Sequence, residues 1–181
     1  MRISGAWRRI FAPAEKTVAA GALYEQIVAQ SRRPEFYLEG GVADSLDGRF
    51  DLMSLHVFLV LRRLKEEGQG KLSQALFDTF FHNLDVGLRE MGVGDLSVGK
   101  KIRQMAEAFY GRVAAYDAAL SAPDEKALVE ALQRNLYRGS IISHNTLNRL
   151  ANYVRWQADN LGRQSGASLA RGDVVFEPFD D

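Results

Sequence analysis

The chain contains no cysteine, and this absence excludes several kinds of chemistry. Disulfide bonds, thiol nucleophiles and metal sites with cysteine ligands are all impossible. An excess of charge of either sign is also missing, because 23 basic residues balance 23 acidic ones. A protein whose main partner is DNA or other bulk nucleic acid usually has a basic surplus, so the composition argues against that class.

A long hydrophobic run is absent as well. The charge-free segment from Leu52 to Leu61 is about half of the ~20 residues that a membrane-spanning helix needs. No secretory signal or stop-transfer segment is visible. We therefore expect a protein of the bacterial cytoplasm, with the mitochondrial matrix as the alternative location.

What the chain does have is a strongly apolar stretch at residues 47–64. Turned at about 100° per residue, the stretch forms one continuous apolar face. That face comprises Phe50, Met53, Val57, Val60, Leu61 and Leu64. Leu52, Leu55 and Leu59 lie elsewhere on the helix, so it is apolar nearly all round. A helix of this kind is usually covered on several sides, which predicts the central helix of a bundle.

Other segments show the same helical spacing of apolar residues. They are residues 17–32, 71–91, a long segment that follows Gly99, a short one after 125 and a last one that Ser143 or Asn145 can cap. No strand pattern of useful length precedes Val174. We predict an all-α, single-domain bundle of about six helices, divided into an N-terminal tail (1–16), a helical domain (17–164) and an extended C-terminal arm (165–181).

One segment imitates a phosphate-binding loop. Gly94 to Lys101 matches most of the G-x-x-x-x-G-K-[ST] pattern. That loop needs a preceding strand, which an amphipathic helix replaces here, and its final Ser/Thr is Lys101. We interpret the segment as a connection between two helices and expect no nucleotide.

The histidines permit two kinds of ligand site. Asp78, His82 and Asp85 share a helix face, which allows either a metal site or a solvated acidic face. His56 lies in the apolar stretch, where it could bind haem or be a hydrogen-bonded core residue. No catalytic constellation emerges. We expect no enzyme, no cofactor and no bound metal.

Two basic clusters are candidate partner-binding surfaces. Arg62 and Arg63 end the central helix, and Phe58 lies on the same, more polar side of it. Lys100, Lys101 and Arg103 begin the long helix that follows the glycines. Such clusters suit docking to acidic protein, phosphates or lipid headgroups, although each is equally well explained as a solvated helix end. Phe58 has the alternative of contacting another helix of the bundle.

The N-terminal tail combines aromatic and basic residues, namely Trp7, Arg8, Arg9 and Phe11. Basic amphipathic segments bind anionic membrane surfaces, so peripheral membrane contact is one interpretation. The other is a loose tail whose aromatic side chains pack against the body of the protein.

Several segments of the sequence, in a consistent order, resemble the ubiquinol–cytochrome c chaperone family. They are Leu23 to Gln30, Pro34 to Tyr37, Asp47 to Leu64, Leu72 to Asp78, Leu88 to Asp95 and Gly99 to Arg112. The resemblance extends from about Leu23 to Leu136.

The resemblance implies an assembly factor for respiratory complex III that binds newly made cytochrome b. It also implies a small partner protein and contact with the ribosome, as in mitochondrial members. The family offers no catalytic residues. The alternative function is a helical module, or a homodimer, that docks a soluble partner unrelated to respiration.

Overall fold

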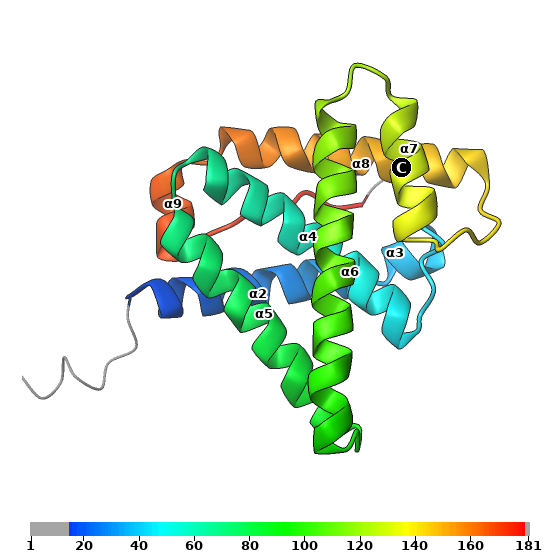
Figure 1. The fold of residues 1–181 in the computed structure, drawn as a ribbon. Coiled ribbons are helices and arrows are strands. Elements are labelled where there is room, and N and C mark those ends of the chain that lie inside the picture. Colours follow the sequence, from blue (N-terminus) through cyan, green and yellow to red (C-terminus); the bar gives the residue numbers. More distant parts are fainter. Residues whose placement is uncertain (1–14, 180–181) are drawn as a thin grey trace, which may run out of the picture.

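The computed structural model describes residues 15–179, and this part is all-α (Figure 1). Its eight helices are α2 (Glu15–Ser31), α3 (Glu35–Leu38), α4 (Leu46–Glu66), α5 (Gly70–Glu90), α6 (Asp95–Ser121), α7 (Lys126–Asn135), α8 (His144–Arg163) and α9 (Gly166–Arg171). The predicted fold class is confirmed. The two shortest helices, α3 and α9, account for the difference from the six expected, because four or six residues are too few to show a helical period.

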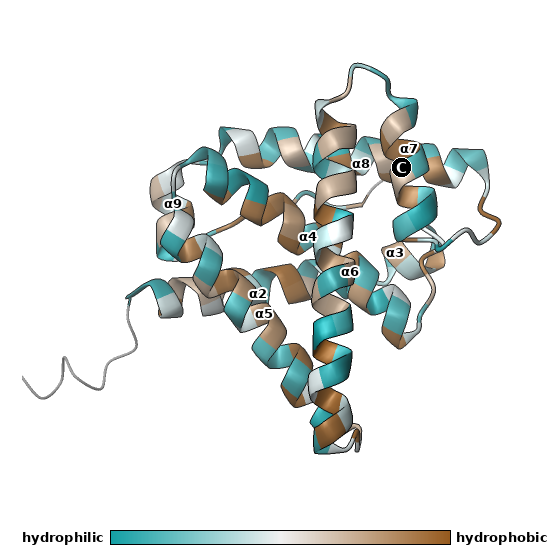
Figure 2. Cartoon of the chain, viewed as in Figure 1, coloured by the Kyte–Doolittle hydropathy of each residue, from teal (hydrophilic) through white to brown (hydrophobic). Residues whose placement is uncertain are grey.

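Helix α4 is the centre of the bundle, as its apolar surface predicts. It contacts α2, α5, α6 and α8. Ser45 caps its start, since the Ser45 side chain accepts a hydrogen bond from the Gly48 backbone N–H at 3.1 Å. Gly48 allows close packing there, because a Cβ atom would lie 2.0 Å from the Ala43 carbonyl oxygen. In Figure 2, hydrophobic ribbon is visible on α4 and on the neighbouring part of α2.

Helices α5 and α6 form a long hairpin that projects from the rest of the bundle (Figure 1). Gly92 ends α5 with a backbone φ of 81°, a left-handed conformation that glycine adopts at little cost. The base of the hairpin packs on α2 and α4, and α6 continues to α7. The hairpin therefore diverges from the body of the bundle and leaves a hollow beside α4.

The segment after α9 is an extended arm. Gly172 ends α9 with φ of 91°, and residues 173–179 then run between α2 and α8, red in Figure 1. The segment expected to be an extended arm from residue 165 thus begins with a short helix. Within residues 15–179, no helix is both long and apolar enough to cross a membrane.

Candidate functional site

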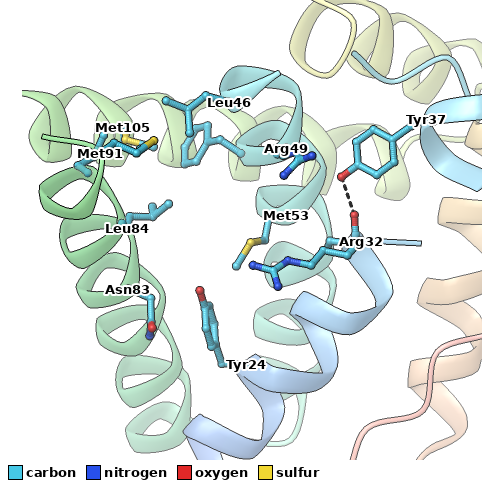
Figure 3. Close-up of a pocket in the computed structure, with 14 residues that line it drawn as sticks. Tyr24, Arg32, Tyr37, Leu46, Arg49, Met53, Asn83, Leu84, Met91 and Met105 are labelled. Atoms are coloured by element: carbon cyan, nitrogen blue, oxygen red, sulfur yellow. Dashed lines mark hydrogen bonds between the residues drawn. The ribbon is translucent and has the colours of Figure 1, made fainter. Parts of the chain in front are cut away.

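A pocket of about 200 Å³ opens between α2, α4, α5 and α6. Its lining is mostly apolar, and much of it is visible in Figure 3. The apolar lining residues are Leu46, Phe50, Met53, Leu84, Leu88, Met91 and Met105. A volume of this size accommodates one or two large side chains rather than a whole helix.

Three of the chain's four methionines line this pocket. Met53 comes from α4, Met91 follows the end of α5, and Met105 comes from α6. Met91 is 56% exposed, so the pocket is open to solvent at the hairpin. Unbranched methionine side chains adapt to irregular apolar partners, which makes the pocket suited to variable hydrophobic segments.

Polar groups surround the pocket on the side of α2 and α4. The Tyr37 hydroxyl donates a hydrogen bond to the Ser31 carbonyl oxygen at 2.7 Å (Figure 3). Arg49 donates to Asp44 at 2.6 Å, whereas Arg32 forms no ion pair within residues 15–179. Burial raises the pKa of Tyr24 above its usual range, so its hydroxyl stays neutral at physiological pH. The rim therefore carries net positive charge around an apolar centre.

Two further hollows adjoin the pocket and share residues with it. One, of about 590 Å³, includes Arg32, Tyr37 and Arg49. The other, of about 350 Å³, is lined by Leu46, Phe50, Leu88 and Met105, together with Lys101 and Arg138. We call the three hollows together the methionine groove. An elongated ligand that crosses it would meet cations on both sides of the apolar pocket.

A buried ionic cluster adjoins the groove through Arg138, which lines one of its hollows. Asp51 of α4 is fully buried, forms an ion pair with Arg112 of α6 at 2.7 Å and accepts a hydrogen bond from Arg138 at 2.6 Å. Burial raises the pKa of Asp51, and the hydrogen bond from Arg138 and the positive charges of Arg112 and Arg138 oppose this effect. Arg138 also reaches Asp47 at 3.0 Å and has a left-handed backbone, with φ of 52°. These bonds connect the start of α4 to α6 and to the end of α7.

Comparison with known proteins identifies the family. The family model described as "Ubiquinol-cytochrome C chaperone" matches residues 38–176, about three quarters of the chain. The chain belongs to this family. The matched region contains all of α4 to α9, and therefore most of the methionine groove.

Named relatives of this family member include assembly factors of animals. The ubiquinol-cytochrome-c reductase complex assembly factor 1 of Xenopus laevis is 29% identical, over 90% of this chain and 82% of its own length. The human protein of that name is 28% identical, and the match covers only 55% of its length. The crystal structure of the Cbp3 homolog from Brucella abortus has a TM-score of 0.80 and 37% identity, and covers 96% of this chain and 95% of that one.

The structure corrects the interpretation of Phe58 as a surface residue. Its side chain is 2% exposed, and its ring lies 5.7 Å from the ring of Tyr116 on α6. The alternative, contact with another helix of the bundle, describes its position. Helical spacing placed Phe58 on a polar side because Asp51 and Ser54 are on that side, but both of these residues are buried as well.

Arg62 and Arg63 are partly buried at the end of α4 and take part in local bonds. Arg62 pairs with Asp117 of α6 at 3.2 Å, and Arg63 pairs with Glu67 at 2.6 Å and donates to the Gln164 carbonyl oxygen at 2.9 Å. Neither residue lines the methionine groove. Arg62 and Arg63 connect α4 to other helices, so they differ from the second predicted basic cluster at the start of α6, whose residues are exposed.

Lys100, Lys101 and Arg103 are exposed on the first turns of α6. Only Lys101 lines a hollow of the groove. Lys101 shares this hollow with Arg138, whereas Arg32 and Arg49 line the other two hollows, and none of these three arginines was among the predicted site residues. The recurrence of methionine on three separate helices was a signal, but it cannot be read as a pocket without knowing how the helices cross.

The remaining candidates lie outside the groove or outside the described residues. Trp7, Arg8, Arg9 and Phe11 belong to the segment that the structure does not describe. No group of three metal-ligating side chains occurs in residues 15–179, and Asp78 and Asp85 instead accept hydrogen bonds from Gln74 and Arg89. Residues 95–101 of the loop-like segment are helical.

His56 is a buried, hydrogen-bonded core residue. Its Nδ1 lies 3.0 Å from the Leu52 carbonyl oxygen and its Nε2 lies 2.7 Å from the Tyr153 hydroxyl. Burial lowers the pKa of His56 to about 4, so the ring is neutral at physiological pH. With Nδ1–H donating to Leu52, Nε2 accepts from Tyr153, and both ring nitrogens have partners.

Proposed function

We propose that this protein is a non-enzymatic chaperone for the assembly of ubiquinol–cytochrome c reductase, and that the methionine groove holds a segment of newly made cytochrome b. Family membership supports the first part of the proposal. The observation that carries the second is the gathering of Met53, Met91 and Met105 from three helices in one open pocket.

The apolar pocket suits a client that belongs in a membrane. A polytopic membrane protein exposes apolar side chains before insertion, and these must be covered to prevent aggregation. A pocket of about 200 Å³ takes one or two such side chains as anchors. Methionine adapts to different anchors without a matched shape, which a chaperone requires.

The cations around the pocket suit the polar ends of the same segment. Arg32 on one side and Lys101 on the other have no ion pair within residues 15–179. Acidic or carbonyl groups beside the apolar anchor would therefore meet unpaired charge. Peripheral contact with the inner membrane of a bacterium would place the groove close to such clients.

Two apolar residues near the turn of the α5–α6 hairpin allow a matched test, because only one of them lines the groove. Met91 lines the pocket, whereas Leu96, which is 98% exposed, lines none of the three hollows. The tagged full-length chain is recovered from detergent-solubilised membranes, and cytochrome b in the recovered fraction is quantified. Met91→Glu is expected to lower recovery about tenfold, the cost of charging an anchor site, and Leu96→Glu is expected to leave it near the wild-type amount.

Circular dichroism and the thermal unfolding midpoint serve as the folding control for both variants. A folded Met91→Glu chain that retains full recovery would rule out the groove as the client site. Recovery of a soluble protein, without cytochrome b, by the unaltered chain would favour the alternative function of a helical module that docks a soluble partner.

The small partner protein and the ribosome that the family resemblance implies belong to the same proposal. They would bind outside the groove, so that the client and these partners are held together. Lys100 and Arg103, exposed beside the groove on α6, are candidate contacts for them.

A further inference from the structure

The C-terminal arm is held by glutamine side chains that bond both N–H and C=O groups of its backbone. Gln157 of α8 donates to the Glu177 carbonyl oxygen at 2.9 Å and accepts from the Glu177 N–H at 3.2 Å. Gln164 makes the same pair of bonds with Val175, at 2.7 and 2.9 Å. Gln26 of α2 donates to Gly172 at 2.7 Å and accepts from Val174 at 3.2 Å.

This pattern reproduces the hydrogen bonding of a neighbouring β-strand. An amide side chain presents N–H donors beside a carbonyl acceptor, so it can pair with the backbone as a neighbouring strand does. Recognition of this kind depends on an extended main chain and tolerates different side chains, as in peptides that add to a sheet edge. The groove between α2 and α8 therefore has the chemistry of an extended-peptide site.

Side-chain selectivity comes from two buried positions. Val174 is 3% exposed and Phe179 is 2% exposed, whereas Val175 between them is 63% exposed. The Phe179 ring stacks on Phe36 with centroids 5.0 Å apart, and the Arg149 guanidinium lies 5.1 Å from its centre. The site thus selects an aliphatic residue and an aromatic residue five positions later.

The floor of this groove is fixed by bonds that do not involve the arm. Gln30 donates to the Tyr153 hydroxyl at 2.8 Å, and this hydroxyl lies 2.7 Å from His56 Nε2. His56 is in turn bonded to the Leu52 carbonyl oxygen of α4. The second N–H of the Gln30 amide reaches the Glu177 carbonyl oxygen at 2.9 Å. Helices α2, α4 and α8 therefore hold the polar floor in place whether or not the arm is bound.

We propose that the groove between α2 and α8 binds an extended segment of a partner protein, which displaces the chain's own arm. The segment carries an aliphatic side chain in place of Val174 and an aromatic one in place of Phe179. The bonds that Gln164 and Asn160 make to Val175 are exposed to solvent, so the arm begins to separate there. This inference does not depend on the identity of the client in the methionine groove.

Peptide binding to the full-length chain tests the proposal. A fluorescent peptide with the sequence of residues 171–179 is titrated into the wild-type chain and into the Phe179→Ala chain, whose own arm is weakened. The variant is expected to bind the peptide at least about tenfold more tightly, because the intact arm competes at a high effective concentration.

Two altered peptides control for selectivity. A peptide with Val174→Ala is expected to bind the Phe179→Ala chain about tenfold more weakly, because a buried aliphatic side chain is lost. A peptide with Val175→Ala is expected to bind unchanged. Absence of peptide binding by a folded Phe179→Ala chain, or equal binding of the two altered peptides, would overturn the proposal.

Hydrogen exchange of the wild-type chain provides a test if the variant does not fold. The backbone amides of Val175 and Glu177 are expected to exchange at least about tenfold faster than the slowest amides of α4, because the arm opens by itself. Exchange of both sets at one common rate would mean that the arm leaves only when the whole bundle unfolds, and the proposal would fail.

Discussion

The two grooves beside α2 differ in the chemistry of the side chains that line them. The methionine groove, on the side of α5 and α6, has an adaptable apolar centre and cations at its rim. The groove on the side of α8 has fixed amide groups and encloses the arm. Apolar contacts carry no direction and hydrogen bonds do, so the first groove suits varied segments and the second suits one extended backbone.

Helix α2 serves both grooves because its side chains point to different sides. Tyr24 lines the methionine pocket, Gln26 and Gln30 bond the arm, and Leu23 and Ile27 are buried in the core. One helix can therefore carry an apolar and a polar recognition surface at once. Substitutions that alter only one of the two grooves therefore test whether the grooves act independently.

The largest effect is expected from the buried ionic cluster of Asp51, Arg112 and Arg138 beside the methionine groove. Asp51→Ala would leave Arg112 buried without its carboxylate, which should cost about 3–5 kcal/mol of unfolding free energy. Chemical denaturation of the purified chain measures it.

Asp47→Ala is the matched control for Asp51→Ala. Asp47 bonds the same Arg138 but is exposed, so its loss should cost well under about 1 kcal/mol. Equal losses in the two variants would show that burial of Asp51 is not what makes the cluster important.

The next largest effect is a pH dependence of stability caused by His56, which lies beneath the C-terminal arm. The folded-state pKa of His56, about 4, lies below its ordinary value of 6.5. Between these values the unfolded chain takes up a proton that the folded chain does not, so stability falls as the pH falls through this window. The loss should reach about 2–3 kcal/mol near pH 4.5, with no contribution from His56 above about pH 7.

Denaturant titrations at pH 7 and pH 4.5, on the wild-type chain and on His56→Gln, measure this contribution. The variant should be less stable at pH 7 and should lose less stability on acidification. Asp51 acts in the opposite direction, because its raised pKa favours folding as the pH falls, and it is present in both chains. The same pH dependence in both chains would exclude His56 as the cause.

The smallest expected effect is a difference in cytochrome b recovery between variants of two adjacent lysines on α6. Lys101 lines a hollow of the methionine groove and Lys100 does not. Lys101→Glu should lower recovery of cytochrome b about two- to fivefold at low salt, less so at high salt, and leave stability unchanged, because exposed charges contribute little to folding. Lys100→Glu should have no effect on this recovery, and equal effects of the two changes would show that only general charge attraction matters.

Much of the fold could be predicted from the sequence, and the site could be predicted only in part. The periodic apolar residues of 47–64 located α4 and its central position, because burial on several sides leaves few polar positions. Lys101, a predicted partner contact, lines a hollow of the proposed groove, and its binding role stays a prediction. Phe58 was placed wrongly, because Asp51 and Ser54 beside it suggested a wet surface, whereas Asp51 is buried with Arg112 and Arg138 from segments far along the chain.

Local residue patterns predicted the six longer helices, their order and the family, since each depends on residues that are near one another in the chain or in a fixed order. The positions of the two grooves follow from how the helices pack in three dimensions. Met53, Met91 and Met105 meet because α4, α5 and α6 cross at particular angles, and Gln26 and Gln157 meet the arm because α2 and α8 flank it. Such contacts depend on packing between segments that are distant in the chain, which no local pattern of residues specifies.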